Sequence, residues 1–548
     1  MTLMQNLFKS NLVRFLTSEN SEQLKKMTLL SVLVGIANTL LISLVNMAAN
    51  NVLNDKSTTL EFFGYVLLLI VFLIFTKKAN NENIKNANQF IYLFKVRVMS
   101  QAFNSSLLKI DKVGRDYILE VLNRDTQMVS QSVFALLSGF QSFATVFFLT
   151  LYLATVSLWA CLIILLSAIF IFILATIELT KLTQAMQAVI LKENEVNAFY
   201  AAFLSGYKEV KMNSHRAYDL TREMLEKARA VTEEKTGMVL NVMQFFTYLQ
   251  MMLYLVVGSI VFVVPLFSSD FSSHVLAATT TALFLASALS SVIQSVPTLS
   301  LANVAAHTLQ ELERKLDGEA DERVMSGVTQ FEQVQTLTLK DVTYVHPKNG
   351  ANQPFMMGPI NYEFDAGKVY FIRGNNGSGK TTLIRVLLGL YQCERGLILV
   401  NGKPIAEPAT SDYRDLFAVV FSDFYLFEKL YGVIQPNAAE ANKLLEEFEM
   451  QDKVSIKDGA FSTTKLSTGQ RKRLGLIVAL LEEKNFIVLD EWAADQDPEF
   501  RRDFYEKIIP RLRALGKTVI AITHDDQYYD LADHVIYMEN GQSVHQHL

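Results

Sequence analysis

The chain has 548 residues, of which 50% are hydrophobic and only 19% are charged, and its formal net charge is -5. This composition is too apolar for an ordinary soluble enzyme, so it predicts a part of the chain that lies in a membrane. The negative charge balance argues against a nucleic-acid partner, because proteins that bind a phosphate backbone usually carry a basic surplus.

Residues 1–26 contain three lysines and one arginine but too short an apolar run for a signal peptide, and we expect them to form an interfacial helix on the cytoplasmic side. Apolar stretches of near-spanning length follow, since roughly 20 residues cross a bilayer as a helix. They occupy residues 27–48, 59–76, 132–155, 157–178, 238–267 and 275–298. The sequence therefore predicts a transmembrane domain with six spans over residues 27–300.

Lysine and arginine are scarce in the short segments within each pair of spans and dense in the long segments between pairs, residues 77–131 and 179–237. By the positive-inside rule, the long segments and both chain ends lie in the cytoplasm. Long loops without structure are uncommon, so we expect the membrane helices to continue and to turn near residues 109–114 and 199–206. These tips could dock on a cytoplasmic domain; ordinary solvated loops are the alternative.

Beyond Pro297 the apolar pattern gives way to a charged stretch, which predicts a linker over residues 301–330. Strand-like and helix-like segments then alternate over residues 331–548, as in an α/β domain. The predicted fold class is a membrane α-helical domain followed by an α/β P-loop ATPase domain.

A glycine-rich turn after the strand-like residues 368–373 opens a helix-like run, which is typical of a phosphate-binding loop. Glycine lets backbone N–H groups approach phosphate oxygens, and the helix N-terminus favours anions at the same place. We expect Lys380 to contact the β- and γ-phosphates and Thr381 to ligand Mg²⁺. The loop comprises Gly374, Asn375, Asn376, Gly377, Ser378, Gly379, Lys380, Thr381 and Thr382.

Two carboxylates, Asp490 and Glu491, follow a short apolar strand at residues 486–489. At the carboxyl edge of a parallel sheet they would face a ligand. We expect Asp490 to hold Mg²⁺ through water and Glu491 to orient and polarise the attacking water. His524, after another strand-like run, would contact a γ-phosphate.

Other residues indicate a second phosphate-binding surface and a contact with the adenine ring. Ser467 and Gly469, before a helix-like run, form a second phosphate-binding surface, and Tyr344 could stack on adenine. Taken singly, each residue has a structural alternative: Tyr344 could be a core tyrosine, Ser467 could be an N-cap, and His524 could be a histidine whose hydrogen bonds are all made within the fold. Their order and spacing favour the functional interpretation.

Together these motifs resemble those of the ATP-binding cassette transporters, and the resemblance covers essentially the whole chain. It implies ATP and Mg²⁺ as cofactors, the segment 466–470 as the signature motif, and Glu491 and His524 as the catalytic residues. Six spans before a single cassette resemble an exporter-type half-transporter, which implies that a second copy of the chain completes each ATP site. The ATP-binding residues that the resemblance adds are Ser422, Thr468, Gln470 and Asp497.

Two positions depart from the family pattern. The signature reads LSTGQ rather than LSGGQ, a change that leaves Ser467 and Gly469 in place. The expected glutamine before residues 423–427 is Ser422. Its shorter side chain favours a water-bridged contact with the metal over a direct one. Asp423 could take over the glutamine's role or merely cap the loop.

The run DEWAADQDP from Asp490, with LSTGQRKR and THDD, is similar to bacterial exporters of cyclic peptides and siderophore precursors. This narrower resemblance implies a homodimer in the bacterial inner membrane, surrounded by lipid, that exports a peptide-like or amphipathic molecule. The alternatives are a lipid flippase or multidrug exporter, an importer with the same fold, and an ATP-gated regulator. Intact Glu491 and His524 argue against the regulator, because gating needs no fast hydrolysis.

The spans carry neutral polar side chains and methionines and no charged pair in the membrane interior, which suits a bulky amphipathic substrate. Packing of helix against helix is the alternative role for each of them. These residues are Gln141, Tyr152, Asn241, Met243, Gln244, Tyr248, Gln250, Met251, Met252, Tyr254 and Gln294.

Overall fold

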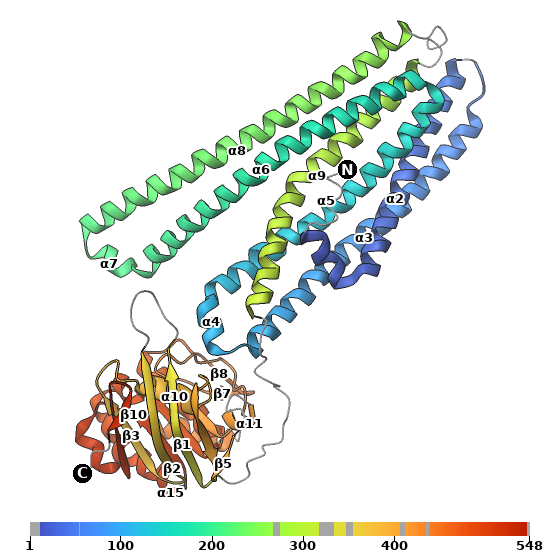
Figure 1. Ribbon diagram of the computed structural model, residues 1–548. Helices are drawn as coiled ribbons and strands as arrows, with labels where there is room; N and C mark the ends of the chain where they lie inside the picture. Colours follow the sequence, from blue (N-terminus) through green and yellow to red (C-terminus); the bar gives the residue numbers. More distant parts are fainter. Residues whose placement is uncertain are drawn as a thin grey trace. The chain divides into compact units, whose positions relative to one another are not determined.

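The computed structural model describes residues 11–53, 55–266, 275–316, 334–346, 355–405, 411–433 and 438–544. The chain divides into two compact units, the first comprising Met1–Ser100 and Val113–Lys315 and the second Gln101–Lys112 and Leu316–Leu548. Figure 1 shows that the first unit consists of long helices and that the second combines strands with short helices. The α-helical membrane class and the α/β class predicted for the two parts are confirmed.

Long helices form the first unit, and five of those in its described part are long and apolar enough to cross a membrane. In α6 the described apolar run is shorter, Leu158–Ile171. The six helices are α2 (Asn11–Leu53), α3 (Thr59–Asn104), α5 (Arg115–Val156), α6 (Leu158–Ser205), α8 (Ser214–Phe262) and α9 (Val275–Leu316). Each predicted apolar stretch lies in one of them, except Ser157, which is the N-cap of α6, and residues 263–266, which follow α8; residue 267 lies outside the described part.

Close helix packing in this unit depends on small and polar residues. A side chain at Gly35 of α2 would meet the carbonyl oxygen of Gln141 in α5 at 2.7 Å, so only glycine allows the two helices to approach this closely. Between α2 and α9, the Asn46 amide donates a 3.0 Å hydrogen bond to Thr281. Buried polar pairs of this kind fix how the helices align where no water is present.

The membrane helices extend well past their apolar stretches, as predicted. Helix α3 has 46 residues and α8 has 49. Two short helices make the turns: α4 (Leu107–Val113) and α7 (Tyr207–Lys211), which begins just after the predicted turn at 199–206. Within the second unit, Leu107 and Leu108 of α4 pack against a hydrophobic cluster.

Two segments differ from their predicted form. The charged stretch that begins the predicted linker, from residue 301, is helical as far as Leu316. Leucines at helical spacing, Leu309, Leu312 and Leu316, are buried there and hold the helix in place; residues 317–333 lie outside the described part. Residues 11–26 begin α2 rather than forming a separate interfacial helix, because no glycine or proline interrupts them.

The second unit contains a sheet of six strands in the order β12-β11-β3-β10-β9-β6 and another of four in the order β2-β1-β4-β5. The strands of the first sheet are β3 (Val369–Gly374), β6 (Phe417–Val420), β9 (Phe486–Asp490), β10 (Thr518–Ile522), β11 (His534–Glu539) and β12 (Gln542–Val544). Those of the second are β1 (Thr336–Val345), β2 (Met356–Asp365), β4 (Arg395–Val400) and β5 (Lys403–Pro404). A short hairpin joins β7 (Ile456–Lys457) to β8 (Ala460–Phe461).

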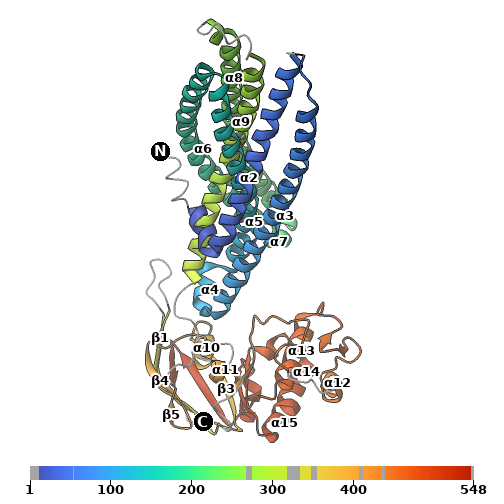
Figure 2. The same cartoon turned by 90° about the vertical axis from the view of Figure 1, so that its right-hand side faces the viewer.

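Helices cover the six-stranded sheet, and Figure 2 places α12 to α15 on one side of the unit and the four-stranded sheet on the other. They are α10 (Lys380–Leu387), α11 (Ser411–Arg414), α12 (Ala438–Glu447), α13 (Thr468–Leu481), α14 (Pro498–Asp503) and α15 (Ile509–Ala514), with a π-helical turn, η4 (Phe504–Ile508), between the last two. Strands β3, β9 and β10 run parallel. Ile522 pairs with both Ile372 and Asp490, so the three strands end at one edge of the sheet.

Candidate active site

The glycine-rich loop leaves β3 and enters α10, as predicted. Its glycines Gly374, Gly377 and Gly379 have φ angles of 149°, 79° and 102°, which side chains rarely adopt. At Gly374 a Cβ would also lie 2.2 Å from the carbonyl oxygen of Met538. The loop can therefore keep its path only with glycine at this position.

Lys380 folds back over the loop. Its amine donates hydrogen bonds to the carbonyl oxygens of Gly374 at 2.7 Å and Asn375 at 3.2 Å. Burial lowers the pKa of Lys380, while the nearby carboxylates of Glu491 and Asp490 raise it. A cation placed this way lies where phosphate oxygens would complete its surroundings.

Asp490 ends β9 beside the loop and is 1% exposed. Its Oδ2 accepts a 3.1 Å hydrogen bond from the Ser422 hydroxyl, and its buried Oδ1 has no partner. Burial raises the pKa of this carboxyl, and the bond from Ser422 lowers it. A buried carboxylate oxygen without a donor fits a hard divalent cation, which prefers oxygen ligands.

Glu491 and His524 lie together, with the His524 Nε2 3.4 Å from the Glu491 Oε1. Glu491 has a φ of 49°, an unusual conformation for a residue other than glycine. The Lys472 amine, from α13, donates a 2.8 Å hydrogen bond to the Glu491 carbonyl oxygen and pairs with Asp495 at 2.7 Å. Because Lys472 is 2% exposed, its amine is a fixed support for the backbone of Glu491.

A second support holds the loop around His524. The hydroxyl of Tyr505, in the π-helical turn η4, lies 2.5 Å from the Thr523 hydroxyl and donates a 2.9 Å bond to Asp525. These are the two neighbours of His524 in the chain. π-Helical turns occur often at functional sites.

Arg501 contacts both the segment that follows Glu491 and the segment that follows His524. Its guanidinium donates to the carbonyl oxygens of Ala493, Ala494 and Gln496 and lies 3.5 Å from Asp525. One side chain therefore links the segment after Glu491 to the segment after His524. Sequence reasoning missed Lys472, Arg501 and Tyr505. The contacts of Lys472 with Glu491 and of Tyr505 with Thr523 join residues 19 and 18 positions apart, and such contacts leave no local pattern.

The predicted signature residues begin α13. Ser467 is the N-cap of this helix, and its side chain and that of Gln470 form a capping box. Thr468 is the first residue of the helix, and a Cβ at Gly469 would lie 2.5 Å from the carbonyl oxygen of Asp495. The N-capping role that the sequence left open for Ser467 is thus present.

Asp497 also has partners within the chain. It caps α14 by accepting a 2.9 Å bond from the Phe500 N–H, and it pairs with Arg473 at 2.5 Å. The Phe500 bond, with help from Arg473, lowers its pKa. Its contact with a nucleotide stays a prediction.

A cavity of about 600 Å³ lies over the loop. It is lined by His346, Phe355, Glu491 and the loop residues Asn376, Gly377, Ser378, Gly379, Lys380, Thr381 and Thr382. The ring of His346 lies 3.2 Å from the Thr382 hydroxyl. Burial, and to a lesser degree Arg385, lowers the pKa of His346, so its ring is neutral at neutral pH.

The prediction of Tyr344 as the adenine-stacking ring is wrong for this structure. Tyr344 is 3% exposed and stacks on Tyr391 with ring centroids 5.0 Å apart, which places it in the hydrophobic core. The core tyrosine that the sequence left open is the correct alternative. Two residues later, His346 lines the cavity and is the aromatic ring available there.

The phosphate loop follows β3, and the carboxylate pair lies at the end of β9, a parallel strand of the same sheet separated from β3 by β10. This arrangement defines a P-loop ATPase, here in one chain with apolar helices of membrane-spanning length.

Comparisons with known proteins identify the family. A model described as ABC transporter matches residues 357–494. The chain is 30% identical to the energy-coupling factor transporter ATP-binding protein EcfA1 of Thermotoga maritima, over 37% of this chain and 79% of that protein. It is 29% identical to the ATP-binding protein SyrD of Pseudomonas syringae pv. syringae, over 94% of this chain and 92% of that protein. The chain belongs to the ABC transporters, whose ATP-binding domain hydrolyses ATP to drive transport.

The similarity of fold extends over both units. The solved structure of a bacterial Atm1-family ABC exporter with ATP bound has a TM-score of 0.75, with 17% sequence identity, over 95% of this chain and 94% of that chain. The fold is therefore of the exporter type, in which the membrane helices precede one ATP-binding domain.

Proposed function

We propose that the chain is one half of a homodimeric exporter, which uses ATP to move a peptide-like amphipathic molecule, such as a cyclic peptide or siderophore precursor, out of the bacterial cytoplasm. The observation that carries this proposal is a cavity of about 600 Å³ among α6, α8 and α9, whose lining mixes aromatic, amide and charged groups. Small-molecule sites have this size and this mixture of groups. A purely apolar lining would favour a lipid flippase.

The cassette residues have distinct roles in this proposal. Lys380 and the N–H groups of the loop bind the phosphates, and Thr381 and Asp490 would hold Mg²⁺. The metal ion, when bound, neutralises charge on the phosphoryl oxygens. Glu491 orients and polarises the attacking water. His524 contacts the γ-phosphate in this proposal, which the 3.4 Å distance between its Nε2 and the Glu491 Oε1 supports.

A second copy of the chain completes each ATP site. The cavity over the phosphate loop has Glu491 in its lining but none of the signature residues Ser467, Thr468, Gly469 and Gln470. If those residues contribute to ATP binding, they do so from another copy. The mass of the purified protein in lipid nanodiscs, measured by light scattering, would correspond to two chains; one chain with full ATPase activity would contradict this.

The proposed location is the bacterial inner membrane, with both termini and the cassette in the cytoplasm. The distribution of lysine and arginine supports this orientation. Cysteines introduced at Lys78 and Lys227, in the extensions of α3 and α8, should react with an impermeant reagent only after the membrane is opened. Reaction in intact cells would reverse the topology.

Transport in a defined system tests the function. Liposomes with the cassettes outside should accumulate a labelled cyclic peptide when Mg²⁺ and ATP are added, and Glu491→Gln and Lys380→Ala should abolish this accumulation. Release of preloaded peptide would indicate an importer. Stimulation of ATPase activity by lipids alone would favour a flippase, and ATP turnover without any movement would favour a regulator.

A further inference from the structure

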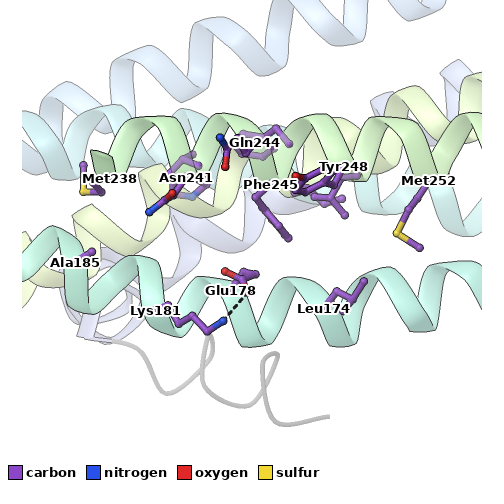
Figure 3. A pocket seen from close by; sticks show the side chains of 15 residues that line it. Leu174, Glu178, Lys181, Ala185, Met238, Asn241, Gln244, Phe245, Tyr248 and Met252 are labelled. Carbon is purple, nitrogen blue, oxygen red and sulfur yellow. Dashed lines mark hydrogen bonds and ion pairs between the residues drawn. The ribbon is translucent and has the colours of Figure 1, made fainter. Parts of the chain in front are cut away.

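The cavity of the membrane-helix unit lies between facing stripes of α6 and α8 (Figure 3). Its α6 side includes Leu174, Glu178 and Lys181, which recur at helical spacing. Its α8 side includes Asn241 and Phe245 at similar spacing. Glu178 and Lys181 form an ion pair of 2.7 Å within this lining.

The charged groups lie at one end of the cavity. Counted from Leu158, where α6 begins, roughly 20 residues cross a bilayer, so Glu178 and Lys181 follow directly after the spanning part. In the proposed topology this end faces the cytoplasm, where a substrate would enter. The deeper part, towards Met252 of α8, is apolar and aromatic.

The ion pair can be exchanged for ligand charges at little cost. Its two residues are three positions apart on one helix, and both side chains are exposed. Exposed pairs of this kind contribute little to stability. A ligand with one positive and one negative group can therefore replace each partner without leaving a charge unpaired.

Hydrogen-bonding groups suited to amides line the same cavity. Asn241 and Gln244 each offer an N–H₂ group and a carbonyl oxygen. Pro297 lies inside α9 and has no N–H to donate to the carbonyl oxygen of Ile293, four residues earlier. Ile293 and Pro297 both line the cavity, and we include this carbonyl oxygen among the acceptors proposed for a ligand N–H.

We propose that this cavity binds a zwitterionic, peptide-like amphiphile. Its carboxylate pairs with Lys181, its ammonium group pairs with Glu178, and its amides bond to Asn241, Gln244 and the Ile293 carbonyl. Its apolar side chains lie against Phe245 and Met252. This inference rests on the proposed export function and adds the substrate class to it.

Binding of matched peptides tests the proposal. The probes are a tetrapeptide of alternating leucine and phenylalanine as the free zwitterion, its N-acetylated form and its C-amidated form, titrated calorimetrically against the full chain in nanodiscs. The zwitterion should bind about tenfold more tightly than either capped form, as expected for one hydrogen-bonded charge. Equal binding of all three forms would overturn the proposal.

Single variants assign each charge. Lys181→Gln should abolish the preference over the C-amidated form and keep the preference over the N-acetylated form, and Glu178→Gln should do the reverse. The matched control is Glu233→Gln. Glu233 pairs with Arg229 on α8, and neither residue lines the cavity. This control should keep both preferences. Variants at Lys181 and Glu178 that also keep both preferences would overturn the proposal.

Two further outcomes separate this inference from the proposed function. If the peptides bind with the expected preferences but are not moved by ATP, the export function fails and the binding site stands. If a peptide is exported regardless of its end groups, the zwitterion site alone fails.

A disulfide between two copies of Asn241→Cys, without any peptide binding, would show that a second copy fills the cavity and would also overturn the proposal.

Discussion

The hydroxyl of Ser422 donates a 3.1 Å hydrogen bond to the carboxylate of Asp490, the residue that ends β9 at the phosphate loop. Sequence comparison with the family marks Ser422 as a departure from glutamine. The structure gives its hydroxyl a direct partner in the carboxylate that we expect to hold the metal. The bond opposes the effect of burial, which raises the pKa of Asp490.

The first prediction concerns Ser422→Ala. Loss of one modest hydrogen bond, about 1 kcal/mol, should lower the ATPase rate about fivefold. Because the bond lowers the pKa of Asp490, its loss raises that pKa further. The acid limb of the rate profile should therefore shift to higher pH, because the carboxylate must be ionised to hold a cation.

Neighbouring variants decide between the alternatives at this position. Ser422→Gln should be tolerated, since glutamine also has a donor. Complete loss of activity in Ser422→Ala would mean that the hydroxyl is a direct metal ligand. If Asp423→Asn causes the loss instead, Asp423 has taken over the role of the family's glutamine.

A second prediction concerns Glu491→Gln. Without the carboxylate, hydrolysis should slow by about 10²-fold or more, the range of general-base contributions. ATP binding should persist, because Lys380 and the loop are unchanged, so the variant should accumulate with ATP bound in a two-chain form. Single-turnover hydrolysis and size analysis would measure both effects. The control is Glu499→Gln, an exposed carboxylate in the first turn of α14; near wild-type turnover in Glu491→Gln would remove Glu491 as the base.

The sequence predicted those parts of the site that are local in the chain. The turn from Gly374 to Gly379 needs glycine for its backbone conformation, and Asp490 ends a short buried strand that Glu491 follows. Such segments carry their own signal, because backbone freedom and burial are encoded in adjacent residues. The supports for Glu491 and His524 are different: Lys472 and Tyr505 lie 19 and 18 residues from their partners Glu491 and Thr523.

Tyr344 shows how one irregular residue reverses a prediction. Alternation along β1 buries Leu337 and Leu339, and without interruption it would turn residue 344 outward. The register shifts between Leu339 and Val342, where Asp341 has a φ of 52°. After this irregularity, Val342 and Tyr344 face the core. A one-residue shift exchanges the two faces of a strand, and the sequence gives no clear signal of it.

A third prediction tests His346 as the stacking ring. His346→Ala should weaken ATP binding about tenfold, because base–aromatic stacking contributes roughly 1–3 kcal/mol, and His346→Phe should restore it. Tyr344→Phe is the control and should leave the affinity unchanged, since that ring is buried.

The pKa of His346 is lowered from the ordinary value near 6.5, so the ring takes up a proton only at a lower pH than a free histidine does. Affinity measured with a fluorescent nucleotide should therefore be constant from about pH 8 down to about 6.5; a titration within that range would contradict a neutral, stacked ring.

The last prediction is that Tyr505 acts through His524. Tyr505→Phe keeps the buried ring but removes the hydroxyl that holds Thr523 and Asp525 on either side of His524. Misplaced catalytic groups cost rate rather than binding, so kcat should fall about tenfold while KM for ATP stays near its wild-type value. Tyr413→Phe is the matched control, because that buried tyrosine donates a 2.5 Å bond to the Leu387 carbonyl oxygen away from His524. Both variants should lose a similar part of their stability, about 1–3 kcal/mol for an unmade buried hydrogen bond. If kcat falls equally in both, the hydroxyl of Tyr505 stabilises the fold without positioning the histidine.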